Sequence, residues 1–125
     1  MNIKFLQLND ISAYKTAFHL SNYVWKIVVC WDNFAKNTLG VQFVRAVDSI
    51  SANIAEGFGR YGKKDRIRFY RYSQGSLKES LDWLHKARVR NLLQVGEYEF
   101  IFAELEKLPK DISSLIAYTN RVLKE

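Results

Sequence analysis

The chain has 125 residues, enough for one hydrophobic core and too few for two, so we expect a single domain over residues 1–125. Hydrophobic residues make up 48% of the chain, which excludes wholesale disorder, and one proline with six glycines is too little for an all-β sandwich. The net charge is +6, and Cys30 is the single cysteine, so an internal disulfide and a cysteine-cluster zinc site are excluded.

Apolar residues recur at steps of three and four along four stretches, the spacing of amphipathic helices. The expected helices cover residues 12–34, 38–57, 63–90 and 97–123. Asp10 or Ser12 can cap the first helix and Thr38 the second. The second helix is expected to end at Gly57, near glycines that can take a left-handed conformation. Pro109 is expected to cause a kink or a brief break in the fourth helix without ending it. Short connections make neighbouring helices antiparallel, which predicts an all-α, up-and-down four-helix bundle.

Two of these helices carry a second apolar row beside the expected core row. In the third helix the core row is Tyr70, Gln74, Leu77, Leu81 and Leu84. Its second row is Phe69, Tyr72, Ser76, Ser80 and Trp83. The first helix has a similar extra row at Tyr14, Phe18, Trp25 and Val28. A monomeric bundle needs one buried stripe per helix, so the extra rows favour self-association. The alternative is that these aromatics only widen the core.

The positive charge is concentrated in one segment. Residues 60–90 hold ten Lys or Arg and three acidic residues. The rest of the chain holds nine Lys or Arg and ten acidic residues. A candidate nucleic-acid-binding set, here called the basic stripe, comprises Arg60, Lys63, Lys64, Arg68, Arg71, Lys78 and Lys86. Such a row can follow a phosphate backbone, and Phe58, Tyr61 and Tyr72 can stack on unpaired bases. The alternative is a solvated charged face.

Catalytic and metal-binding patterns are missing from the sequence. Neither His19 nor His85 follows a glutamate by three residues, the spacing of di-iron bundles. The glycines at 57–62 lack the Gly-Lys-Ser/Thr ending of a phosphate-binding loop. We therefore expect no enzyme, no metal and no cofactor, and a buried, inert Cys30.

We also expect a cytoplasmic protein without a membrane span. No charged-then-apolar leader opens the chain. The strongest apolar stretch, residues 23–31, is interrupted by Lys26 and is too short to cross a bilayer. The single cysteine fits a reduced compartment.

Two sequence motifs resemble a known bacterial family. The first is Ala52-Asn53-Ile54-Ala55-Glu56-Gly57, and the second is Gly75-Ser76-Leu77-Lys78-Glu79. They resemble the four-helix-bundle family named after the 23S rRNA-intervening-sequence protein, and the resemblance runs over nearly the whole chain. Ser51 stands where the family usually has proline, and Gln74 where it often has arginine.

The resemblance implies an up-and-down bundle and, in similar proteins, a ring-shaped homopentamer. It also implies distant kinship with nucleic-acid-binding accessory proteins of diversity-generating retroelements, and it brings no catalytic residues. The matched polar residues are candidates for a network between helices or subunits: Arg45, Asn53, Glu56 and Glu79. We expect a non-catalytic, oligomeric protein that binds RNA or DNA. The alternative is an adaptor that binds an acidic protein partner.

Overall fold

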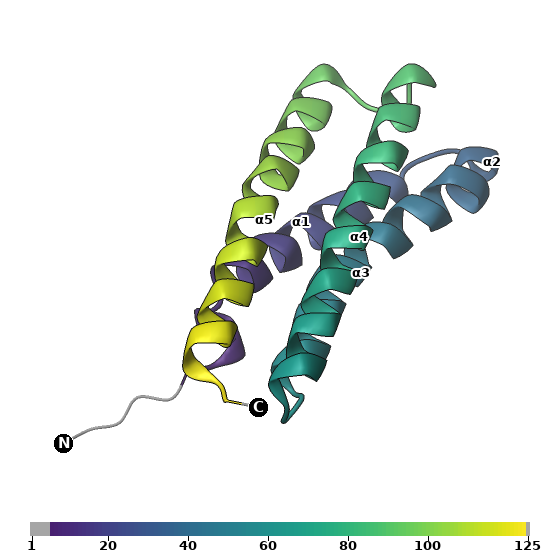
Figure 1. Ribbon diagram of the computed structural model, residues 1–125. Coiled ribbons are helices and arrows are strands. Elements are labelled where there is room, and N and C mark those ends of the chain that lie inside the picture. The colour runs from purple at the N-terminus through teal and green to yellow at the C-terminus, as the bar shows by residue number, and fades with distance from the viewer. Residues whose placement is uncertain (1–5, 125) are drawn as a thin grey trace.

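The computed structural model describes residues 6–124, and the described chain is helical throughout its regular elements (Figure 1). In chain order the elements are η1 (Leu8–Asp10), α1 (Ser12–Val28), α2 (Asn33–Ala35), η2 (Lys36–Gly40), α3 (Val41–Phe58), α4 (Lys63–Val89) and α5 (Val95–Val122). The four long helices each pack on their neighbours in chain order, and α5 closes the bundle against α1. The expected all-α four-helix bundle is confirmed.

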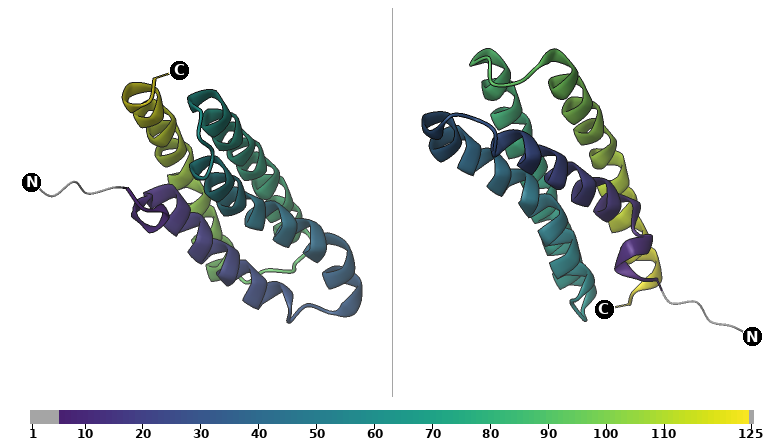
Figure 2. Two further views of the ribbon diagram at one scale, coloured as in Figure 1. Left: turned by 90° about the horizontal axis from the view of Figure 1, so that it is seen from below. Right: turned by 180° about the vertical axis from the view of Figure 1, so that it is seen from behind.

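The bundle is antiparallel, so helix ends that are distant in the sequence meet at one end of the molecule. The α3–α4 contact is the most extensive of the helix pairs. The connection between these helices lies at the same end of the molecule as the start of α1 and the end of α5 (Figures 1 and 2). The first turns of α4 therefore lie beside the last turns of α5, although more than forty residues of sequence separate them.

The first helix is shorter than its apolar pattern predicts. It ends at Val28, and a turn at residues 29–32 follows, so the expected end at residue 34 is wrong. The next helical stretch begins at Asn33, because the Asp32 carboxylate accepts a hydrogen bond from the Ala35 N–H at 3.0 Å and caps it. Phe34, which falls inside the range expected for the first helix, is 80% exposed. The apolar spacing of the first helix continues through residues 29–34, although the chain turns there and Asp32 starts a new helical stretch.

The expected second-helix cap at Thr38 is also wrong. Thr38 lies inside the π-helical segment η2, which joins α2 to α3, and its hydroxyl donates to the Phe34 carbonyl at 2.7 Å. Neither Asp10 nor Ser12 caps α1. The Asp10 carboxylate accepts from the Gln7 N–H at 2.8 Å, and the Ser12 hydroxyl bonds Asp111 on α5 at 3.3 Å.

The helix ends near the glycines also differ from expectation. The α3 helix runs to Phe58, and Gly59 beyond it has φ −79°, so no left-handed glycine closes it. Among the described residues, Asn91 alone has a positive φ, at 59°. There the Leu92 N–H bonds the Ala87 carbonyl at 2.9 Å, which closes α4. As predicted, α5 continues through Pro109.

The core row of α4 is built partly from serines. Its buried members are Tyr70, Ser73, Leu77, Ser80, Leu84 and Ala87. The expected members Gln74 and Leu81 are only half-buried at its edges. The Ser73 hydroxyl donates to the Ile50 carbonyl of α3 at 2.8 Å, so a buried polar group is satisfied across the helix pair. Cys30 is exposed, which corrects the expectation of a buried thiol.

Candidate nucleic-acid interface

The basic stripe follows α4 from its first turn to its last. Arg60 lies in the connection before α4, and the other members lie on the helix itself. A helix rises 1.5 Å per residue, so Lys64 and Lys86 are separated by about 33 Å along the axis. The stripe is long enough to meet several consecutive phosphates of an extended strand.

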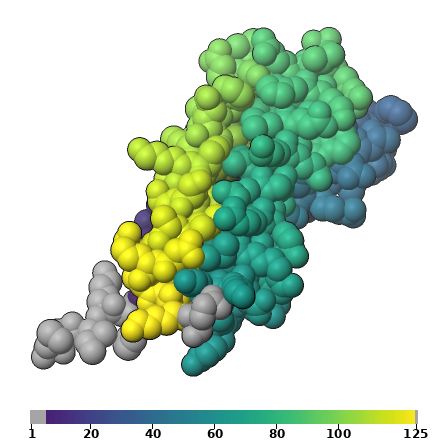
Figure 3. Space-filling model, viewed as in Figure 1, coloured from purple at the N-terminus to yellow at the C-terminus, as the bar shows by residue number. Residues whose placement is uncertain are grey.

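Four stripe residues converge on one hollow, here called the basic hollow. It has a volume of about 540 Å³ and is lined by Lys63, Lys64, Ile67, Arg68, Arg71, Tyr72 and Asn120. The α4 residues in this set recur as neighbouring pairs at steps of four, which places them on one side of the helix. Asn120 comes from α5, which runs beside α4 on the face shown in Figure 3. The hollow therefore lies where the antiparallel packing brings the first turns of α4 beside the last turns of α5.

The two arginines that line the hollow are lightly neutralised. Arg68 pairs with Asp65 at 3.1 Å, and both side chains are about half exposed, so this pair is weak and can exchange with another anion. Arg71 makes no ion pair or hydrogen bond with its side chain among residues 6–124. Arg60, outside the hollow, pairs with Glu56 at 3.3 Å. The hollow thus presents a local positive field.

The two remaining stripe residues lie apart from the hollow. Lys86 pairs with Asp82 at 2.7 Å, and its ammonium sits 4.5 Å from the Trp83 ring centroid. Lys78 is exposed between the hollow and Lys86, and within the described chain its side chain has no ion-pair partner. The stripe on α4 therefore consists of a cluster of four cations at the basic hollow, followed by two separate cations further along the helix.

An aromatic pair adjoins the hollow. The Tyr72 ring meets Phe69 edge to face, with centroids 5.4 Å apart and planes at 84°. The guanidinium carbons of Arg60 and Arg68 lie 4.7 and 5.3 Å from the Phe69 centroid. These contacts fix Phe69, and Phe69 in turn supports Tyr72, which keeps half of its surface exposed.

The other two aromatic candidates have different settings. Tyr61 is fully exposed in the connection before α4. Phe58 is partly buried against the core, and the Arg66 guanidinium carbon lies 5.4 Å from its centroid. Tyr61 and Tyr72 therefore offer more free ring surface for stacking than Phe58 does.

The four candidate network residues do not gather within one chain. The Asn53 amide donates to the Ser49 carbonyl at 2.9 Å and lies 3.5 Å from the Ser76 hydroxyl, which links α3 to α4. Glu56 pairs with Arg60 instead. In the described part of the chain, the side chains of Arg45 and Glu79 have no ion-pair partner.

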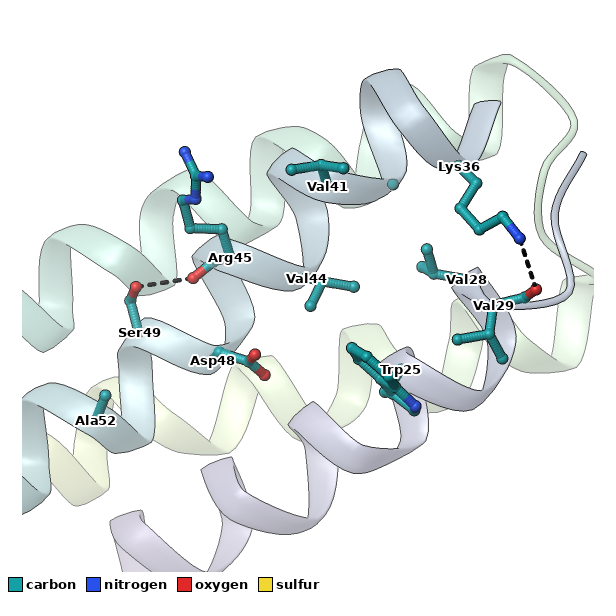
Figure 4. A pocket seen from close by; sticks show the side chains of 11 residues that line it. Trp25, Val28, Val29, Lys36, Val41, Val44, Arg45, Asp48, Ser49 and Ala52 are labelled. Atoms are coloured by element: carbon teal, nitrogen blue, oxygen red, sulfur yellow. Dashed lines mark hydrogen bonds between the residues drawn. The ribbon is translucent and has the colours of Figure 1, made fainter. Parts of the chain in front are cut away.

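A second hollow, which the sequence did not predict, lies between α1 and α3 (Figure 4). This apolar hollow has a volume of about 500 Å³, and its walls include Trp25, Val28, Val29, Val41 and Val44. Arg45 and Asp48 stand at its edge, and partial burial there raises the pKa of the Asp48 carboxyl. The hint in the sequence is the extra row of the first helix, which supplies both Trp25 and Val28 to this hollow.

The extra apolar rows are partly exposed. Trp25 is 56% exposed, Phe18 is 46% exposed and Tyr72 is 50% exposed. Val28 and Ser80, assigned to the same rows, are buried in the core instead. The rows therefore divide between the core and the surface.

The described residues hold no group of three His, Cys, Asp or Glu side chains placed to bind a metal ion. Within the same part of the chain, no helix combines the length and apolar character needed to cross a membrane.

The fold and these surfaces define a small helical bundle that carries the basic stripe on α4 and the apolar hollow between α1 and α3. The chain belongs to the 23S rRNA-intervening sequence protein family, whose model matches residues 9–114. Its fold is similar to a crystal structure of a protein of unknown function from the S23 ribosomal protein family of Bacteroides thetaiotaomicron. The TM-score is 0.73 at 19% identity, covering 83% of this chain and 97% of the other. No curated protein matches the chain.

Proposed function

We propose that this protein is a non-catalytic, oligomeric bundle that binds the RNA or DNA backbone through the basic stripe, with the basic hollow as the centre of contact. The observation that carries the proposal is the convergence of Lys63, Lys64, Arg68 and Arg71 on one hollow. Phosphate contacts of this kind supply affinity without reading sequence. A cytoplasmic location, as expected from the sequence, is part of the proposal.

The oligomer is the second part of the proposal. Trp25, Val29 and Val41 are each more than two-fifths exposed around the apolar hollow, which supports a subunit contact there. A homopentamer is the form implied by the proteins that this chain resembles. A closed ring would repeat the basic stripe in every subunit and increase the affinity for long strands by avidity. Light scattering at micromolar concentration tests the assembly, and a monomeric mass would contradict it.

The binding test changes Lys64, Arg68 and Arg71 to glutamine together. Affinity for arbitrary RNA should fall, and the slope of log affinity against log salt should flatten by about 0.7 per lost contact on single strands or about 0.9 on duplexes. The control changes three exposed lysines on other helices, Lys15, Lys26 and Lys110, to glutamine, which removes the same charge elsewhere.

Equal slopes for the parent and the stripe variant would contradict the proposal. If the parent itself binds no nucleic acid at low salt, an acidic protein partner becomes the favoured occupant of the stripe.

A further inference from the structure

We propose that the basic hollow takes an unpaired base, so that the protein prefers single-stranded nucleic acid to a duplex. This inference rests on the proposed function and specifies the ligand of the same site. Its basis is that the hollow combines cations with apolar and amide groups, whereas backbone binding alone requires only cations.

The size and walls of the hollow suit a nucleotide. A volume of about 540 Å³ lies within the range of small-molecule sites. Ile67 and the Tyr72 ring form its apolar part, while Arg68 and Arg71 lie along the same side of α4. A base could rest against the apolar part while its phosphates meet the cations. In a duplex the bases are stacked and paired inside the helix, so only phosphates and groove edges would reach this surface.

Tyr72 is the stacking residue in this arrangement. Its ring is half exposed, and its edge-to-face contact with Phe69 holds it in place. A ring held before binding loses little freedom when a base stacks on it, which increases the net gain from stacking. Tyr61, fully exposed two residues before α4 begins, can serve the neighbouring base.

Asn120 adds a group that a purely electrostatic surface would not need. It lines the hollow from α5, opposite the cations of α4. Its amide can both donate and accept hydrogen bonds, whereas lysine and arginine only donate. No hydrogen bond occupies this amide among the described residues, so it is available to the edge of an unpaired base.

The test compares three fluorescently labelled probes with the same number of phosphates, at the same salt concentration. They are an oligouridine, an abasic strand with the same backbone, and a blunt RNA duplex. The parent should bind the oligouridine about tenfold more tightly than the abasic strand, which corresponds to one stacked base. The duplex should bind no more tightly than the abasic strand. Equal affinity for oligouridine and abasic strand, or tighter binding of the duplex, would overturn the inference.

Substitutions in the hollow test whether the preference for oligouridine over the abasic strand arises there. Tyr72→Leu should reduce the preference for oligouridine to nearly none, while Tyr72→Phe should keep it. Tyr118→Leu is the matched control, since Tyr118 is 41% exposed on α5 and lies outside the basic hollow. A preference that survives Tyr72→Leu in a folded protein would overturn the assignment. If Tyr72→Leu does not fold, Asn120→Ala is the replacement test, because Asn120 lies at an exposed position. An unchanged preference for oligouridine in this variant would exclude the hollow as the base-binding site.

The outcomes separate the two proposals. If all three probes bind with equal affinity and the salt slope falls in the stripe variant, backbone binding stands and base insertion is wrong. If no probe binds at low salt, the proposed function itself is wrong.

Discussion

Gly57 of α3 lies so close to the Tyr70 ring of α4 that no side chain fits between them. A β-carbon added at Gly57 would lie 2.8 Å from Cε1 of Tyr70 and 2.9 Å from the Arg66 carbonyl oxygen. Tyr70 is fully buried, so its ring cannot move aside into solvent. This contact sets the separation of α3 and α4 at the end of the bundle where the basic hollow lies.

Gly57→Ala should therefore destabilise the protein. Alanine is a better helix former than glycine by about 1 kcal/mol, but overpacking a closed contact costs about 1–3 kcal/mol, and here one obstacle is backbone. We expect a net loss in the free energy of unfolding, measured by urea denaturation. Gly75→Ala is the control, because an added β-carbon there meets no atom within 4 Å. It should stabilise α4 by about 0.5–1 kcal/mol. An equal gain at both positions would contradict the contact.

The sequence predicts the fold well because helical periodicity persists across each long helix. It fails between residues 29 and 40, where apolar spacing continues through a turn and local capping by Asp32 decides the boundary. It also misplaces the α4 core, since a hydrophobic pattern cannot show that Ser73 finds a buried acceptor on α3.

The candidate site was likewise predictable only in part. The cations could be predicted because they are neighbours in sequence. The basic hollow could not, because Asn120 joins it only through the packing of α5 beside α4. The apolar hollow likewise requires the relative placement of α1 and α3, which no single segment encodes.

The revised core row of α4 gives a second prediction. Leu84 is fully buried, whereas Leu81 is only partly buried at the edge of the core. Leu84→Ala should reduce the free energy of unfolding by about 2–5 kcal/mol. Leu81→Ala should cost less, because solvent already reaches that side chain. Denaturation of both variants checks the order, and a larger loss at Leu81 would restore the row expected from the sequence.

Asp48 gives a prediction about pH. Partial burial at the edge of the apolar hollow raises the pKa of its carboxyl, so the charged form is disfavoured in the folded protein. The resulting penalty is absent below the ordinary carboxyl pKa of about 4, grows as the pH rises from there, and is complete above the raised value. Asp48→Asn removes this penalty, so the melting temperature of the variant relative to the parent should increase from about pH 3 to neutral pH. A difference that stays constant or falls over this range would show that the carboxylate is not disfavoured by folding.

The last prediction separates the basic hollow from the rest of the stripe. Arg71 lines the hollow, whereas Lys78 lies two turns further along α4 and outside it. Arg71→Gln and Lys78→Gln each remove one positive charge from the same helix, so they change the long-range field of the protein to a similar degree. If binding centres on the hollow, Arg71→Gln should weaken the binding of single-stranded RNA and flatten the salt slope by about 0.7, while Lys78→Gln should change both less. Fluorescence anisotropy over a series of salt concentrations measures both quantities. Equal effects of the two changes would mean that the strand follows the whole stripe, with no preferred contact at the hollow.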